Sequence, residues 1–126
     1  MTTVVGPFAG PARSVPSPAA VALRVQCRRA KAIADAAPVR FADMPAGPAE
    51  VSAAGGEVRF IVRPQSLSDW TRWAQELGAT DPRRTTHTGS QTIVRCEVGG
   101  VRMRLVGVGV PALLSEHARR SGVRRG

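Results

Sequence analysis

Hydrophobic and charged positions alternate with a period of two over residues 57–63, where Val58, Phe60 and Val62 take the even-numbered positions. This alternation predicts a β-strand with one face against a core, because successive side chains of a strand point to opposite sides. Pro64 ends the pattern, since proline cannot donate a backbone hydrogen bond to a neighbouring strand.

Apolar residues then recur at helical spacing over residues 67–77. Ser66, followed by an aspartate three residues later, resembles a capping box, and Gly78 is typical of a helix end. Trp70 and Trp73 share the apolar stripe of this helix. We therefore expect both indoles to pack in the core, and we prefer this to a role as a stacking platform for a ligand.

Two further segments, residues 92–98 and 101–108, alternate in the same way on either side of Gly99 and Gly100. A Gly-Gly loop readily adopts the positive φ angles of a type I′ turn, so the two segments are predicted to form a β-hairpin. The two-residue loop fixes the register of that hairpin. Residues 84–88 are predicted to add a short strand.

The predicted register divides the side chains of the sheet between two faces. One face is apolar and should carry the tryptophan-bearing helix; it comprises Val58, Phe60, Val62, Val94, Cys96, Val98, Val101, Met103 and Leu105. The other carries five arginines as candidate binding residues, with Glu97 as the single acid: Arg59, Arg63, Arg95, Arg102 and Arg104. Arg95 is predicted to lie opposite Arg104, and such a like-charge pair destabilises a sheet unless an anion offsets it. The alternative is that these arginines only solvate an open face.

Residues 1–56 are low in complexity and rich in proline, alanine and glycine, so we expect a largely disordered N-terminal third. Within it, a helix is predicted over residues 18–37, capped by Ser17 and stopped by Pro38, and it is either solvated and partly formed or binds a partner. Residues 38–56 are expected to be a linker that ends in Gly55-Gly56. For residues 1–43, a transit peptide and a mis-assigned start, with Met44 as the later start, stay open.

Residues 111–126 are predicted to form a short helix, ended by Ser121 and Gly122, and a basic tail. The tail forms a second group of candidate binding residues: Arg119, Arg120, Arg124 and Arg125. The fold class that follows is α+β, with one domain over residues 57–110. Its small, antiparallel-containing sheet has the order β-α-β-β, or βαβββ with the short strand, and packs on one tryptophan-bearing helix.

The charge balance points to an acidic partner. The 126-residue chain has 18 basic and 9 acidic residues, a net charge of +9 and a pI near 11.6. All but one of the basic residues are arginine, a bias typical of GC-rich codon usage that does not itself create net charge. A folded unit of roughly 55–65 residues buries little surface, so a homo-oligomer or another partner is expected.

Cysteine usage and hydropathy favour a cytoplasmic protein. Two cysteines are too few for a disulfide framework. No membrane interaction is expected, because no apolar run approaches the roughly 18–20 residues of a membrane span. Prolines interrupt the apolar stretch near the N-terminus, which argues against a secretory signal.

The residues predict no metal and no cofactor. Cys27, His87, Cys96 and His117 lack the paired spacing of zinc ligands, and the glycines do not form a phosphate-binding loop. Cys96 is predicted to face the core, where a thiol is inert packing rather than a nucleophile. His87 is expected to be a surface histidine. We therefore expect a non-enzymatic protein.

The order strand, helix ending in Leu77-Gly78, then two or three strands resembles the βαβββ half-module of the vicinal oxygen chelate (glyoxalase-like) superfamily over Val58 to Val108. The resemblance implies two paired modules that build a metal site from His and Glu ligands. This chain has one module and no histidine on its first strand, and so departs from that pattern.

The residues support three functional hypotheses. The first is an accessory domain that docks an acidic surface, nucleic acid ahead of protein, through the arginine-bearing sheet face and the basic tail. No Trp, Phe or Tyr lies on the arginine side, so only non-specific phosphate contact is expected. The second is a protein-interaction or self-assembling module. The third is a degenerate glyoxalase-like half-module that binds a small molecule.

Overall fold

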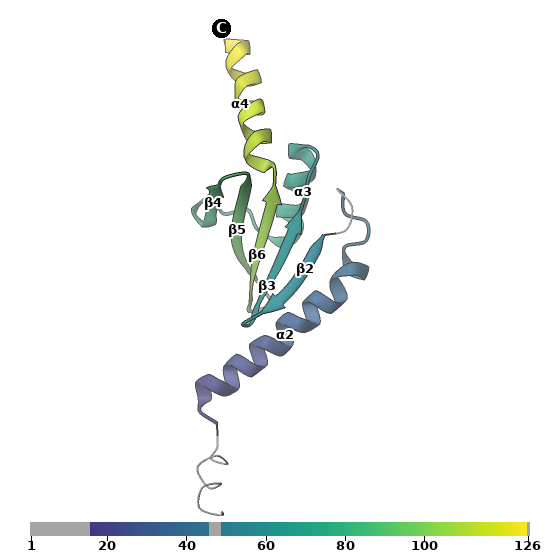
Figure 1. The fold of residues 1–126 in the computed structure, drawn as a ribbon, viewed down its shortest axis with the longest axis vertical. Helices are drawn as coiled ribbons and strands as arrows, with labels where there is room; N and C mark the ends of the chain where they lie inside the picture. Colours follow the sequence, from purple (N-terminus) through teal and green to yellow (C-terminus); the bar gives the residue numbers. More distant parts are fainter. Residues whose placement is uncertain (1–15, 46–48, 126) are drawn as a thin grey trace, which may run out of the picture.

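A computed structural model describes residues 16–45 and 49–125 (Figure 1). Its elements along the chain are α2 (Pro18–Arg40), β2 (Glu50–Ala54), β3 (Glu57–Val62), α3 (Leu67–Leu77), a 3-10 turn (Pro82–Arg84), β4 (Thr85–Thr88), β5 (Gln91–Val98), β6 (Val101–Val108) and α4 (Val110–Arg125). The strands form a five-stranded mixed sheet in the order β2-β3-β6-β5-β4. β3 and β6 run parallel, and the other neighbouring strands are antiparallel. The predicted α+β class is confirmed, and β3 to β6 follow the order βαβββ.

The tryptophan-bearing helix α3 begins and ends where the sequence predicts. The Ser66 side chain accepts a hydrogen bond from the backbone N–H of Asp69, and Gly78 closes the helix in the left-handed conformation at φ 68°. The Asp69 carboxylate completes the cap differently from the usual box, because it accepts from the backbone N–H of Gln65. Trp73 is 1% exposed and its indole N–H donates to the Pro45 carbonyl at 2.9 Å, so the prediction of tryptophans in the core is confirmed.

The predicted β5–β6 hairpin is also confirmed, residue by residue. Gly99 and Gly100 have φ angles of 59° and 79°, as a type I′ turn requires. Arg95 lies opposite Arg104, and the other pairs next to the turn match the predicted register. The short strand expected over residues 84–88 is β4, which pairs with β5.

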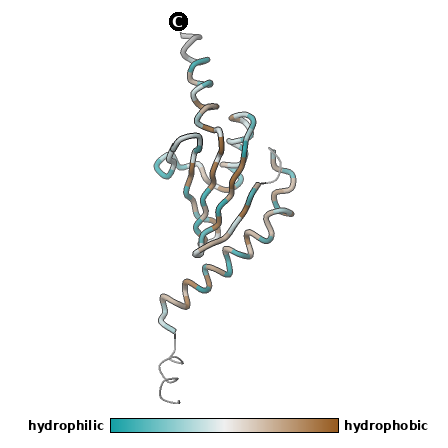
Figure 2. The backbone as a smooth tube through the Cα atoms, in the orientation of Figure 1, coloured by the Kyte–Doolittle hydropathy of each residue, from teal (hydrophilic) through white to brown (hydrophobic). Residues whose placement is uncertain are grey.

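The sheet has helices on one face, where the predicted apolar residues are buried. Val58 and Phe60 are fully buried there, and Cys96 is 7% exposed. The brown, hydrophobic positions of Figure 2 lie mainly along the strands. Both α2 and α3 contribute side chains to this core. The prediction of a sheet packed on one helix is therefore incomplete, because α2 packs on the same face as α3.

The expected disordered N-terminal third is wrong over its described part. α2 spans 23 residues, beginning at the predicted cap Ser17 with Pro18 at its first position. It contacts β2 and β3, and Ala30 and Ala37 are buried against them because small side chains let the helix approach closely. Residues 1–15 lie outside the described part of the chain, so the expectation of disorder there stays a prediction.

Two details within residues 38–56 also differ from the expected linker. Pro38 does not stop α2, because it lies in the last turn of the helix. The buried Phe41 closes the helix by donating its backbone N–H to the Ala37 carbonyl at 2.9 Å. Gly55 and Gly56 form a second hairpin turn, with φ angles of 59° and 78°, that brings β2 alongside β3. This Gly-Gly pair has the same turn chemistry as Gly99 and Gly100, so the prediction of a linker end at these residues is wrong.

The C-terminal helix α4 follows β6 and extends away from the sheet (Figure 1). Its first residue, Val110, is fully buried, and its early turns contact α3 and β5. The predicted end at Ser121 and Gly122 is wrong, since the helical backbone continues to Arg125.

Candidate binding surface

The face of the sheet opposite α2 and α3 carries three arginines side by side. Arg59 of β3 lies beside Arg104 of β6, and Arg104 lies beside Arg95 of β5. We call Arg59, Arg104 and Arg95 the arginine row. Neighbouring strands are about 4.8 Å apart, so the backbone of the row spans about 10 Å. Arg59 and Arg95 are exposed and Arg104 is half-buried.

A row of alternating charge flanks the arginine row on the side of the hairpin turns. Arg102 of β6 lies between Glu57 of β3 and Glu97 of β5. The prediction that Glu97 is the single acid on this face is wrong. Glu57 and Glu50 share the face, because pairing of β3 with β6 and β2 brings them there.

An apolar row lies on the other flank of the arginine row. It consists of Ile61, Val106 and Ile93 on the same three strands, and Val106 is only 5% exposed. The alternation of β6 breaks here, since Val106 and Val108 take positions that held arginine earlier in the strand. Sequence reasoning missed this row because the isolated Ile61 and Ile93 gave no pattern until the strands were paired.

Ion pairs neutralise part of the positive charge of this face. Arg104 approaches the Glu57 carboxylate at 3.4 Å, and Arg63 approaches Glu50 at 3.2 Å. The Arg104 Nε is buried and has no hydrogen-bond partner in the described chain. Arg59, Arg95 and Arg102 form no ion pair within the described residues. The row thus has one exposed guanidinium group, of Arg59 or Arg95, on each side of the partly neutralised Arg104.

The predicted basic tail is not part of the arginine row. Val110, the start of α4, lies six positions after Arg104, about 20 Å of extended chain, and α4 leads further away. Arg119 is exposed, and Arg120 forms an ion pair with Glu116. The side chains of Arg124 and Arg125 lie outside the part of the chain that the structure describes.

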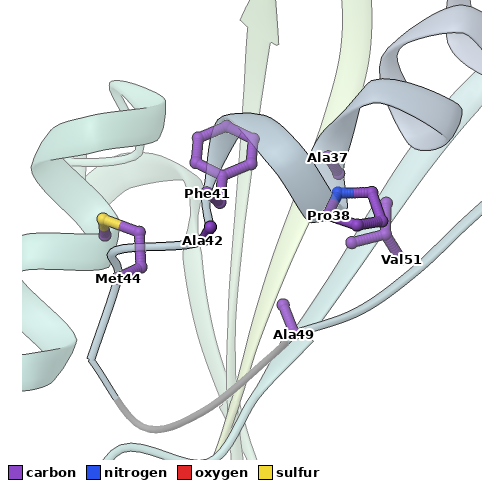
Figure 3. Close-up of a pocket in the computed structure, with 7 residues that line it drawn as sticks. All are labelled: Ala37, Pro38, Phe41, Ala42, Met44, Ala49 and Val51. Atoms are coloured by element: carbon purple, nitrogen blue, oxygen red, sulfur yellow. The ribbon is translucent and has the colours of Figure 1, made fainter.

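On the helical side of the sheet, the structure contains an apolar pocket of about 340 Å³ at the end of α2 (Figure 3). It is lined by Ala37, Pro38, Phe41, Ala42, Met44, Ala49 and Val51. None of these side chains can donate or accept a strong hydrogen bond, so the pocket offers packing but no chemistry.

The structure also places the two cysteines and His87. Cys96 faces the core as predicted, and burial raises the pKa of its thiol, while the positive charge of Arg84 acts in the opposite direction. Cys27 is exposed on α2. His87 is exposed as expected, but its Nδ1 lies 2.8 Å from the hydroxyl of buried Thr92. No cluster of metal-binding type with three or more His, Cys, Asp or Glu occurs in the described residues.

The described helices include none that is both long and apolar enough to cross a bilayer. Fold and surface together define a small α+β protein with helices on one face of a mixed sheet and arginines on the other. Comparisons with family models, curated proteins and solved structures found no match to this chain.

Proposed function

We propose that the protein is a non-enzymatic binding domain that docks an acidic partner on the arginine row, with nucleic-acid phosphate favoured over acidic protein. The proposal rests on one observation: Arg59, Arg104 and Arg95 occupy adjacent register positions on an uncovered sheet face. Like charges directly opposite one another destabilise a sheet. A bound anion would offset that cost, because guanidinium groups bind phosphate or carboxylate through paired hydrogen bonds.

The charge of the complete chain supports a polyanion as the partner. A net charge of +9 attracts extended anions from a distance and speeds their encounter with the surface. None of the described residues on this sheet face is aromatic, so bases have no stacking platform there. Binding is therefore expected to depend on phosphates and on salt, without reading sequence.

The test compares two double variants of the full chain that lose the same charge. Arg59→Gln/Arg95→Gln removes the exposed ends of the arginine row, while Arg72→Gln/Arg83→Gln removes two exposed arginines elsewhere. Fluorescence anisotropy with a labelled DNA duplex is measured over a salt series. The row variant should bind about tenfold more weakly at ~100 mM salt, and its slope of log K against log salt should fall by about 1.8, close to 0.9 per lost phosphate contact.

The control variant should stay close to the wild type. Equal losses in the two variants would assign binding to overall charge and not to the row. A wild-type protein that binds polyglutamate but not DNA would replace nucleic acid with an acidic protein as the partner. Absence of binding to both at low salt would refute the proposed function.

A second candidate function is that of a protein-interaction or self-assembling module, and the apolar row favours it. Ile61, Val106 and Ile93 lie on three neighbouring strands in the middle of the uncovered face. Burying the partly exposed Ile61 and Ile93 against a second copy would remove apolar surface from water. Light scattering on the same samples separates the two functions, since a monomer at high concentration contradicts self-assembly.

A further inference from the structure

A groove of about 570 Å³ lies on the helical side of the sheet, between α3 and the strands β4 and β5. Its walls come from α3, the 3-10 turn, β4, β5 and α4, and include Trp70, Ala74, Pro82, His87, Thr92 and Leu114. None of its lining residues is Asp, Glu, Lys or Arg. The volume lies in the range of small-molecule sites, and the lining combines apolar side chains with a few polar groups, as such sites do.

Trp70 supplies the first polar group of the groove. It is 9% exposed, and its indole N–H donates to no acceptor among the described residues. That nitrogen is also not among the fully buried polar atoms without a partner, so it keeps access to solvent. The Cε3 and Cζ3 atoms of the ring lie against Gly107, so the ring packs on β6. A ligand that brings an acceptor can take the place of water at this donor.

His87 and Thr92 supply the second polar group. The Thr92 side chain is 1% exposed, and its hydroxyl lies 2.8 Å from His87 Nδ1. Each partner of this hydrogen bond can act as donor or acceptor. The direction of the bond sets the imidazole tautomer, and Nε2 then takes the opposite role to Nδ1 toward a ligand. Trp70 packs on Gly107, which is the register partner of Thr92, so the Trp70 ring and the His87–Thr92 pair lie near the same point of the sheet.

We infer that this groove binds an uncharged aromatic molecule that carries a hydrogen-bond acceptor. The apolar walls accept a planar ring, the Trp70 N–H binds the acceptor, and the His87–Thr92 pair binds a second polar group. The absence of charged lining residues disfavours charged ligands, since a carboxylate or an ammonium would lose hydration without gaining a partner. The groove lies on the opposite side of the sheet from the arginine row, so the inference is independent of the proposed function.

The chain carries its own reporter for this site, because Trp70 and Trp73 are its only tryptophans. We would titrate the full ¹⁵N-labelled protein with benzamide, and in parallel with benzoate and benzylamine, and follow the two indole N–H signals by NMR. Benzamide should shift the Trp70 signal saturably at millimolar concentration. The Trp73 signal should not move, because its N–H is already bonded to Pro45. Benzoate and benzylamine should bind more weakly.

Matched threonine variants then assign the contact. Thr92→Val keeps the shape of the side chain and removes the hydroxyl, and should weaken benzamide binding about three- to tenfold, the range of one hydrogen bond. Thr88→Val changes an exposed threonine of β4 and should have no effect. His87→Ala, at an exposed position, serves as a second variant that is not expected to disturb folding. Shifts of both indole signals together, shifts of neither, or equal affinity in Thr92→Val and the wild type would overturn the inference.

Discussion

Gly107 illustrates how one residue controls the packing between sheet and helices. Its φ lies outside the left-handed region, so glycine is not required for backbone reasons. A Cβ at this position would lie 2.5 Å from Trp70 Cζ3 and 2.5 Å from Val110 Cγ2, closer than packed carbon atoms can approach. Glycine is therefore needed because the Trp70 ring and the start of α4 both rest on this point of β6.

We expect Gly107→Ala to destabilise the protein by about 1–3 kcal/mol, the usual cost of forcing extra volume into a packed core. Urea unfolding would measure the loss, and near-UV circular dichroism should show a changed tryptophan environment. Gly89→Ala is the control, since a Cβ there meets nothing but the positive φ of 58° imposes backbone strain. It should lower stability without changing the tryptophan signal. A Gly107→Ala variant as stable as the wild type would contradict the packing described here.

The buried Cys96 thiol should couple the stability of the protein to pH. Burial raises the pKa of the Cys96 thiol, so the folded state disfavours the thiolate. Stability is then intact below the ordinary pKa of a thiol and falls as the pH rises through the raised value, because only the unfolded chain deprotonates easily. The chain has no tyrosine to titrate in the same range.

The measurement is the free energy of unfolding in urea under reducing conditions, from neutral to alkaline pH. Cys96→Val should show a smaller alkaline decline than the wild type, because the titrating thiol is gone. Cys27→Val alters the exposed thiol and should retain the wild-type decline. If the two variants declined equally, the Cys96 thiol would not be the group responsible.

Among the secondary-structure elements, α2 is the one whose role the structure changes most. Phe41, directly after α2, packs edge-on against Phe60 at 5.3 Å between ring centroids and lies 5.7 Å from Trp73. α2 is thus joined to β3 and α3 through one aromatic cluster. This cluster holds α2 in place, although the helix itself has only a thin apolar stripe.

Phe41→Ala should cost about 3 kcal/mol or more, the usual range for removing a buried aromatic ring. Val39→Ala, two residues earlier and 84% exposed, should change stability by no more than about 0.5 kcal/mol. Thermal and urea unfolding of both variants would measure the difference. Equal, small effects would mean that α2 does not stabilise the sheet.

For the complete domain, the two faces of the sheet can be tested separately. The arginine row lies on the uncovered face, and the groove at Trp70 lies on the helical face. The Arg59→Gln/Arg95→Gln variant should therefore keep the full benzamide response, and Thr92→Val should keep the full DNA affinity. Each variant thereby serves as a folding control for the other.

Local chemistry explains why much of the fold could be predicted from the sequence. The alternation in β3, β5 and β6 depends only on which residues neighbour one another along the chain, and so does the cap at Ser66. The turn at Gly99 and Gly100 fixed the register, and with it the opposition of Arg95 and Arg104. These features are short-range, and short-range patterns are visible in a single sequence.

The candidate sites could be predicted only in part, because they combine residues from distant segments. The sequence identified the arginines of β5 and β6 as neighbours, but the parallel pairing of β3 with β6 completed the arginine row and brought in Glu57. The groove joins α3, β4, β5 and α4, and nothing in the spacing of Trp70, His87 and Thr92 connects them.

The sequence by itself determined the two-sided strands, the tryptophan helix and the Gly-Gly hairpin, because periodicity, caps and turns act within a few residues. Only the tertiary structure decided that α2 and β2 belong to the folded domain. The apolar stripe of α2 is weak and consists largely of alanines. Their burial depends on a sheet that forms from residues further along the chain. The arginine row and the groove were decided in the same way, since contact between remote strands and helices creates them.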